Sequence, residues 1–410
     1  MKLNPVAVVL VPLWIVAACD TNQSGNISAT KSGDTSRPVE RSSPTAEQRA
    51  ACGDGAMTSD GATLVRREPY LQQLTASSGK IGWVSTSGDG AMVKLTNPDG
   101  TAVMSALGAI ERSTLRSADE LQLWGAMNGL QPDTIYCYEL ADATHALNAR
   151  TGFRTAPTAD STKPVRFLAF GDSGGGGSDQ YSLMEQMSTV PFDLIIHTGD
   201  LAYDDGTIDQ FEDNVFGVYA ELFRNLPFFP AAGNHEYHTL QGAPFRAVFD
   251  LPAENGEKWY SYDWGRVHFA ALDTEADYET QAAWLDRDLA ANTLPWKIVY
   301  VHKPPYSSGN HGSDMSLRKA LAPVLEKHHV QLLLAGHDHS YERMKPQNGV
   351  AYVVTGGGGR GTYNVGTSSF TAFSAEVIHF VQVEVSVDEL VLHAIDATGR
   401  EFDSMVVPRE

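Results

Sequence analysis

The sequence predicts two folded domains: an all-β sandwich, followed by an α/β domain with two mixed sheets flanked by helices. At 410 residues the chain is longer than one ordinary domain. Residues 66–155 hold short alternating polar and apolar runs between turn signals, which is typical of antiparallel strands. Beyond residue 164, apolar runs alternate with amphipathic runs, which indicates mostly parallel sheet covered by helices. We place the segments of the chain at 1–18, 19–52, 53–156 and 157–410.

The first 18 residues indicate an export signal. Lys2 supplies a positive charge, and residues 6–18 form an apolar stretch that is short for a membrane span. The run Val16-Ala17-Ala18-Cys19 resembles the lipobox of bacterial lipoproteins, in which the cysteine is lipidated and begins the mature chain. We therefore expect an exported protein, anchored to a membrane by lipid at Cys19 and facing the periplasm or the outside of the cell. An ordinary cleaved signal is the alternative.

Residues 19–52 are expected to form a flexible tether. They are rich in Ser, Thr, Asn and Gly and hold almost no large apolar side chain that could build a core. With Cys19 assigned to the lipid, Cys52 and Cys137 remain, and an oxidising compartment favours a disulfide between them. Two free thiols are the alternative, because the sequence does not give their separation.

The first domain should be a small β-sandwich with Trp83 in its core. The run from Gly129 to Tyr138 contains Leu-x-Pro-x-Thr-x-Tyr and resembles the tyrosine corner of fibronectin type III domains, so we expect a fibronectin type III-like fold. Residues 155–164 are the predicted linker to the second domain. Strands are expected at Ile81–Ser85, Ala91–Thr96, Gln122–Ala126 and Thr134–Leu140.

The second domain should alternate strands and helices. Its last predicted run, Phe380 to Ala394, has two β-rich halves that we expect to complete a second sheet. Strands are expected at Val165–Phe170, Leu194–His197, Val267–Leu272, Ile298–Val301 and Val330–Leu334. Helices are expected at Asp179–Met187, Ile208–Phe223, Thr280–Ala291 and Met315–Lys327.

Five short blocks rich in metal-ligand side chains follow predicted strands of this domain. Ligands bind beyond the carboxyl ends of the strands in such sheets, so these blocks should meet at one edge. Together they offer two carboxylates, an amide, three imidazoles and a phenol, which is enough for two cations that share a bridging ligand. Each block alone could be an ordinary turn or cap, and only their joint occurrence predicts a two-metal site. The candidate ligands are Asp172, Asp200, Tyr203, Asn234, His302, His337 and His339.

These blocks resemble those of the calcineurin-like metallophosphoesterase superfamily, and the resemblance covers residues 165–407. Most of that superfamily has Asp-x-His in the first block, whereas this chain has Gly174 at the place of the histidine. Tyr203, three residues after Asp200, is positioned to replace it, and Gly-Asp-x-x-Tyr looks like the purple acid phosphatase branch. The run Arg67-Glu68-Pro69-Tyr70-Leu71-Gln72 is also similar to the N-terminal domain of that family.

The resemblance divides the ligands into two sets that share Asp200. Asp172, Asp200 and Tyr203 would give the first set three anionic oxygen atoms beside His339, which favours Fe³⁺. The second set has one carboxylate, one amide and two imidazoles, which suits Zn²⁺, Fe²⁺ or Mn²⁺. Its members would be Asp200, Asn234, His302 and His337.

The implied reaction is attack of a metal-bound hydroxide on a phosphoester. His235 and His311 are the candidate catalytic residues, because either could protonate the leaving oxygen. For His311 the alternative is a mobile residue on a surface loop. Arg343 should pair with Glu342 or brace its loop, so both are expected to support the ligands rather than to contact substrate.

The sequence thus predicts an exported acid phosphatase that hydrolyses small phosphomonoesters. A phosphodiesterase or nucleotide pyrophosphatase with the same site is one alternative, and a non-catalytic lipoprotein that binds a partner is another. The formal net charge of −20 argues against nucleic acid as a partner, since phosphate backbones are held by clusters of Lys and Arg. It does not argue against a small phosphate substrate, because cations at the site would set the local potential. Contact with a membrane is expected only through the lipid.

Overall fold

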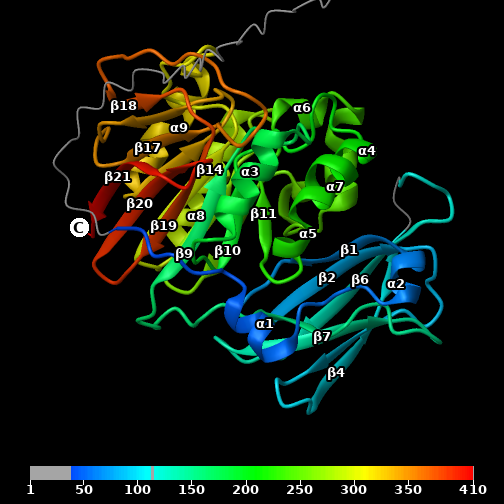
Figure 1. The fold of residues 1–410 in the computed structure, drawn as a ribbon. Coiled ribbons are helices and arrows are strands. Elements are labelled where there is room, and N and C mark those ends of the chain that lie inside the picture. Colours follow the sequence, from blue (N-terminus) through cyan, green and yellow to red (C-terminus); the bar gives the residue numbers. More distant parts are fainter. Residues whose placement is uncertain (1–37, 112–114, 410) are drawn as a thin grey trace, which may run out of the picture. The chain divides into compact units, whose positions relative to one another are not determined.

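The computed structural model describes residues 38–111 and 115–409, and Figure 1 shows their fold. The export signal, the lipidation site at Cys19 and most of the predicted tether lie outside the described residues. Within the described ranges, no helix is both long enough and apolar enough to cross a membrane.

The first domain consists of two four-stranded antiparallel sheets that share a core. Trp83 and Leu123 from one sheet and Val93 and Tyr138 from the other are fully buried in the same cluster. The hydroxyl of Tyr136 accepts a hydrogen bond from the backbone N–H of Gln131 at 2.9 Å, as a tyrosine corner does. One sheet has the order β1-β2-β6-β5, with β1 Val65–Gln72, β2 Ser78–Ser85, β6 Leu121–Asn128 and β5 Ala109–Glu111. The other has the order β4-β3-β7-β8, with β4 Ala102–Leu107, β3 Met92–Thr96, β7 Ile135–Ala141 and β8 Thr151–Arg154.

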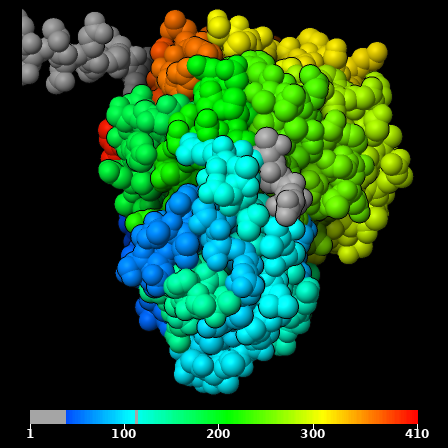
Figure 2. Space-filling view, turned by 90° about the vertical axis from the view of Figure 1, so that its right-hand side faces the viewer, coloured from blue at the N-terminus to red at the C-terminus, as the bar shows by residue number. Residues whose placement is uncertain are grey.

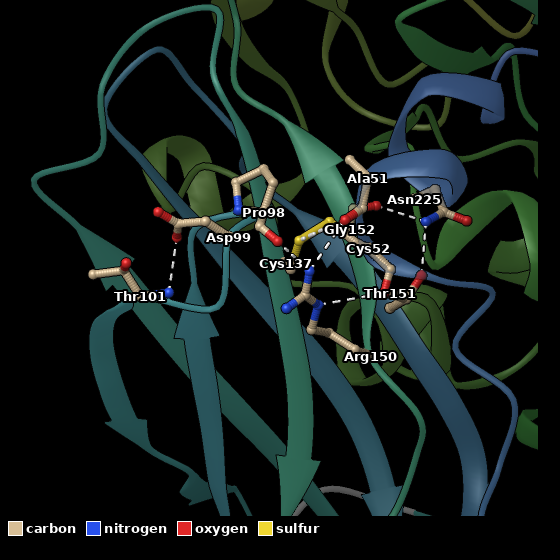
Figure 3. The surroundings of a disulfide bond; sticks show 10 residues. All are labelled: Ala51, Cys52, Pro98, Asp99, Thr101, Cys137, Arg150, Thr151, Gly152 and Asn225. Atoms are coloured by element: carbon tan, nitrogen blue, oxygen red, sulfur yellow. Dashed lines mark hydrogen bonds between the residues drawn. A yellow bond between two sulfur atoms is a disulfide. The ribbon is translucent and has the colours of Figure 1, made fainter.

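The prediction of a flexible tether as far as residue 52 is wrong at its end. Helix α1 spans Ala46–Cys52 and packs on β7 and β8, and α2 follows at Ser59–Leu64. The expected disulfide is present, with the Cα atoms of Cys52 and Cys137 5.3 Å apart (Figure 3). Arg150 donates a hydrogen bond to the carbonyl of Ala51 at 3.1 Å, which satisfies one carbonyl at the end of α1. The disulfide and these contacts hold a segment that has little apolar surface of its own.

The second domain begins after the linker and has four layers: helix, sheet, sheet, helix. The first sheet is mixed, and its parallel strands β11, β10 and β9 continue into antiparallel β19, β20 and β21. Its strands are β9 Val165–Phe170, β10 Leu194–His197, β11 Phe228–Pro230, β19 His379–Val385, β20 Glu389–Asp396 and β21 Glu401–Pro408. Helices on its outer face are α3 Ser178–Met187 and α5 Gly217–Phe223, and further short helices are α4 Ile208–Phe211, α6 Asn234–Tyr237 and α7 Ala243–Val248.

The second sheet is also mixed and packs on the first. Phe269 meets Phe167 of the first sheet edge to face, with ring centres 5.3 Å apart. Its opposite face buries the apolar sides of α8 Tyr278–Ala291 and α9 Met315–Lys327. Its strands, in spatial order, are β12 Tyr260–Trp264, β13 Val267–Ala271, β14 Trp296–Val301, β15 Leu332–Ala335, β17 Ala351–Thr355, β16 Tyr341–Met344 and β18 Thr371–Ala375.

Two details of the second domain differ from the sequence prediction. The run Phe380–Ala394 forms β19 and β20 of the first sheet, because β19 pairs antiparallel with β9 over five residues. The predicted helix Ile208–Phe223 is interrupted by a wider turn of π-helix at Glu212–Phe216. Such turns occur often at functional sites, and here Glu212 forms an ion pair with the fully buried Arg67.

The run 67–72 that the sequence singled out lies in contact with the second domain. Arg67 stacks on the ring of Phe216 at 4.1 Å, in addition to its ion pair with Glu212. The hydroxyl of Tyr70 donates to the carbonyl of Val248 at 2.7 Å. These contacts explain why β1 carries a buried arginine and a buried tyrosine. In the space-filling view, the blue-to-cyan surface belongs to the first domain and the green-to-orange surface to the second (Figure 2).

Candidate metal centre

Each predicted metal ligand lies one to six residues beyond the carboxyl end of a parallel strand. Asp172 follows β9, Asp200 follows β10 and His302 follows β14. Asp172, Asp200 and His337 have positive φ angles of 59°, 56° and 71°. This left-handed conformation is uncommon for residues with a side chain and clusters at functional sites. It turns the chain sharply at the strand end, so that the side chains of all seven residues converge.

The first donor set converges on the phenol of Tyr203. Its oxygen lies 3.2 Å from Asp172 Oδ1, 3.0 Å from Asp200 Oδ2 and 3.1 Å from His339 Nε2. His339 Nε2 is also 3.5 Å from Asp172 Oδ1. Tyr203 is only 6% exposed, and both aspartates are buried. The four side chains that the resemblance assigned to the first metal therefore present their ligand atoms to one small volume.

The second donor set converges beside it on His302. Nε2 of His302 lies 3.2 Å from Asp200 Oδ2, 3.1 Å from Asn234 Oδ1 and 3.2 Å from His337 Nδ1. Two ring nitrogens and two oxygens that face one another at this distance need a proton or a cation between them. Asp200 belongs to both sets, as a bridging ligand must.

Glycine at position 174 and tyrosine at position 203 depend on each other. A Cβ atom at Gly174 would lie 1.4 Å from the carbonyl oxygen of Leu201, so no other residue fits against that loop. The carbonyl of Gly174 accepts the backbone N–H of Tyr203 at 2.9 Å. Glycine at position 174 thus leaves the space into which the Tyr203 loop packs.

The charges in the centre favour a cation. Burial, followed by the negative charges of Asp172 and Asp200, raises the pKa of the Tyr203 phenol well above its ordinary value. Burial also raises the pKa of Asp172, and Asp200 adds to that shift. His302 has its pKa lowered by burial but raised overall to about 9, chiefly by Asp200. Phenolate and carboxylates can all lose their protons here only if positive charge compensates them, and two bound metal ions would supply it.

The comparisons with known proteins agree with this geometry. Residues 165–341 match the calcineurin-like phosphoesterase family. Tartrate-resistant acid phosphatase type 5 of Sus scrofa is 28% identical over 323 residues, which cover 64% of this chain and 92% of that protein. Residues 165–341 thus carry a calcineurin-like phosphoesterase domain, and the purple acid phosphatase relatives support that family for this chain. The predicted resemblance is therefore confirmed.

Other purple acid phosphatases match a smaller share of their own length. "Probable inactive purple acid phosphatase 27" of Arabidopsis thaliana is 28% identical over 298 residues, and the match spans 57% of this chain and 48% of that relative. Among solved structures, a purple acid phosphatase from yellow lupin (Lupinus luteus) seeds superposes with a TM-score of 0.75 over 83% of this chain and 74% of its own, at 21% identity. That likeness supports the fold.

Glu236 is a residue of this centre to which the sequence analysis gave no role. It is fully buried, and its two carboxylate oxygens accept backbone N–H groups from Asp200, Leu201, Ala202 and Gly233 at 2.8–3.0 Å. Four donors on one carboxylate hold the Asp200–Tyr203 loop against the Asn234 loop. The only sequence signal was its place in the block Gly233-Asn234-His235-Glu236.

The two predicted catalytic residues lie beside different donor sets: His235 is next to the first set and His311 is next to the second. The ring of His235 packs on that of Tyr203, with centres 4.2 Å apart, and its Nδ1 lies 2.6 Å from the carbonyl oxygen of Asp204. The ring of His311 lies 4.2 Å from that of His337. The nitrogen Nε2 of His235 is 3.9 Å from Asp200 Oδ2, so His235 is beside the ligands without being one of them.

Two acidic residues hold the His311 loop in place. Asp338 accepts the backbone N–H of His311 at 2.7 Å, and Glu342 accepts that of Ser308 at 2.6 Å. Glu342 therefore supports the site, but Arg343 does not pair with it. Arg343 instead donates two hydrogen bonds to Asp403 of β21, at 2.7 and 2.9 Å, because successive residues of β16 point to opposite faces of the sheet.

Other histidines of this domain mostly contact neighbouring polar groups. His197 Nε2 lies 2.8 Å from the hydroxyl of Ser173, and His328 Nε2 lies 2.6 Å from Asp286. His268 lies between Asp263 and Asp288, 2.7 Å from each. His238 is half-exposed at the surface.

Proposed function

We propose that this protein is an exported acid phosphatase that hydrolyses small phosphomonoesters at a centre of two metal ions. The observation that carries the proposal is the convergence of seven ligand side chains on two adjacent points, with Asp200 in common. Every side chain of the expected ligand set is present among the described residues. The proposal thus rests on this chain's own donors, whatever activity each relative has.

The first donor set suits Fe³⁺ and the second a divalent ion, Zn²⁺, Fe²⁺ or Mn²⁺. Asp172, Asp200, Tyr203 and His339 would hold the iron, because hard anionic oxygen atoms favour a trivalent ion. Asn234, His302 and His337 would hold the divalent ion together with Asp200. When bound, the two ions would supply a water of lowered pKa and positive charge for the phosphoryl oxygens.

The protein's own groups would orient the phosphate and move a proton. If His235 donates its Nδ1 proton to the carbonyl of Asp204, its Nε2 is left free at the edge of the first set. His311 is held by Asp338 above His337, at the edge of the second set. Either ring could give a proton to the leaving oxygen, which would otherwise depart as an alkoxide.

We further propose that a lipid at Cys19 anchors the exported protein to a membrane. Residues 1–18 have the composition of a lipoprotein signal, and the Cys52–Cys137 disulfide is compatible with an oxidising compartment. The partners would be small phosphate esters rather than nucleic acid, since the net charge is −20.

The test is hydrolysis of an aryl phosphomonoester by Asn234→Ala and His337→Ala variants. We expect both to lose most activity, with a His145→Ala variant in the first domain as the matched control. Unchanged turnover in either ligand variant would refute the proposal. Comparing aryl mono- and diesters then tests the diesterase alternative, which predicts faster turnover of the diester.

A further inference from the structure

Arg360 places a positive charge at the edge of the metal centre that the proposed reaction does not use. Its backbone N–H donates to the carbonyl of the ligand Asp172 at 3.0 Å, so the residue is directly attached to the site. Its guanidinium lies over the ring of Tyr203, 5.1 Å from the ring centre.

The guanidinium is held by contacts that leave part of it available. Its stem runs past Gly175, where a Cβ atom would lie 3.0 Å from Arg360 Cδ. Its Nη2 donates to Asp204 Oδ1 at 2.8 Å, but the two side chains are 40% and 68% exposed. An ion pair this exposed contributes little stability and is readily exchanged for another anion. The cation is therefore positioned by the Tyr203 ring and the glycine loop rather than locked by Asp204.

Tyr363, three residues further along the same segment, borders the centre on the side of His339. Its ring stacks on that of His339 with centres 4.1 Å apart and planes 12° apart, and it lies 5.8 Å from the ring of His311. The segment from Arg360 to Tyr363 thus lines the centre beside Tyr203 and His339. A phosphate ester whose phosphate lies among the donor sets would extend its leaving group past this segment.

The position of the guanidinium decides what it can recognise. It lies over the Tyr203 ring and pairs with Asp204, whereas the phenol oxygen of that ring meets Asp172 and Asp200. The proposed function places the phosphate among the donor sets, so the partly exposed guanidinium beside them is available to a second anion of the substrate. A second anion attached to the same substrate would reach it, and arginine binds phosphate and carboxylate with paired N–H groups.

We propose that Arg360 selects phosphoesters that carry a second anionic group close to the scissile phosphate, by exchanging its ion pair with Asp204 for that group. This inference rests on the proposed phosphatase function. Asp204 then acts as the competitor that makes the exchange selective, because a substrate without a second anion gains nothing from breaking the pair.

The test compares kcat/KM for two matched pairs of substrates. Adenosine diphosphate against adenosine monophosphate reports on a second phosphate, and 3-carboxyphenyl phosphate against phenyl phosphate reports on a carboxylate. Arg360→Gln should lower the ratio of kcat/KM within at least one pair about tenfold, the scale of one charge-assisted hydrogen bond. The pair that responds identifies the anion.

Three further variants make the test specific. Arg360→Lys should restore part of the ratio, since it keeps the charge without the paired geometry. Asp204→Asn should raise the ratio two- to threefold, because it removes the competing carboxylate but keeps the backbone carbonyl that contacts His235. Arg400→Gln removes another exposed arginine that pairs with an aspartate, Asp396, and should leave the ratio as in the wild type.

The outcomes separate this inference from the proposed function. A wild-type protein that hydrolyses none of the four compounds contradicts the phosphatase function itself. An active wild type in which Arg360→Gln changes neither ratio, or lowers kcat/KM equally for both members of each pair, overturns the role of Arg360 alone. Metal content of each variant, measured in parallel, shows whether the centre is still assembled.

Discussion

The two donor sets of the metal centre share Asp200 but offer different atoms. Around Tyr203 the first set has three oxygen ligands and one imidazole, and three of its four residues follow strands of the first sheet. Around His302 the second set has two imidazoles, and its residues come equally from both sheets. One edge of a pair of sheets can therefore present a metal site rich in hard oxygen ligands beside a second site that is richer in imidazole ligands. The replacement of one histidine by Gly174 and Tyr203 makes them unequal.

The largest effect should come from the ligand common to both sets. Asp200→Asn keeps the shape of the side chain but removes the charge that the two ions would share. We expect kcat for an aryl phosphate to fall by more than about 1,000-fold, because metal ions supply several kcal/mol of charge stabilisation and each 1.36 kcal/mol is tenfold. Metal analysis should show less of both ions. A variant with both metals and near-normal turnover would contradict the bridging role.

Substituting a ligand of one donor set at a time should remove one metal ion and leave the other bound. Tyr203→Phe should remove the broad violet band expected of a phenolate bound to Fe³⁺ while the divalent ion stays. His302→Ala should do the reverse: the divalent ion is lost and the band remains. Visible spectra and metal analysis of the two variants are the measurement. If both variants lose both ions to the same extent, the sets bind metal only as one unit and the comparison between them fails.

Glu236 should affect the first set and the bridge through the backbone rather than by binding metal. Glu236→Gln replaces a carboxylate that accepts four N–H groups by an amide with a single acceptor oxygen. We expect metal affinity to fall about 10- to 100-fold, the range found when groups behind metal ligands are changed. Titration of the metal-free protein measures it. Equal affinity in wild type and variant would show that the loop holds its shape without Glu236.

His268 lies outside both donor sets and serves as a comparison for them. Substituting it should change the stability of the fold but not catalysis. Burial lowers its pKa, but Asp263 and Asp288 raise it overall to about 9 from 6.5. A raised pKa stabilises the fold fully below about pH 6.5, and the contribution disappears as the pH rises through about 9. At 1.36 kcal/mol per pKa unit the contribution is at most about 3 kcal/mol.

Denaturant unfolding of wild type and His268→Gln across pH 6 to 10 checks this sign. The difference in unfolding free energy between them should shrink as the pH rises. A difference that grows with pH would mean that His268 is uncharged between its two carboxylates. Turnover of an aryl phosphate should be the same in both proteins at any pH where both are folded.

The ligands could be predicted from the sequence because each follows a strand within one or a few residues. A strand of apolar residues and the block after it are local features, and parallel strands bring their carboxyl ends to one edge. The same reasoning could not find the partner of Arg343, which is Asp403 on a strand 60 positions away. It also assigned residues 380–394 to the wrong sheet, because the pairing of β19 with β9 is a contact distant in sequence.

The residues of helix α1 favour a helix, but the polar composition of the segment before them predicted a flexible tether. The run Ala46–Cys52 is rich in alanine, which favours a helix, but it adjoins a long polar segment that has no core residues. A short helix of this kind is marginal alone. Its place on β7 and β8, with the disulfide to Cys137, is what makes it part of the domain.

By itself the sequence predicted the class of the two domains, the seven candidate ligand residues and the resemblance to purple acid phosphatases, because strand periodicity and strand-end motifs are local properties of the chain. Only the tertiary structure decided that the ligand atoms of the two expected sets lie within about 3 Å of one another, that Gly174 makes room for Tyr203, and that Glu236 and Asp338 hold the loops. It also brought Arg360 to the edge of the centre. These relations depend on how loops from separate strands pack together. Contacts between segments distant in sequence cannot be predicted from any one segment alone.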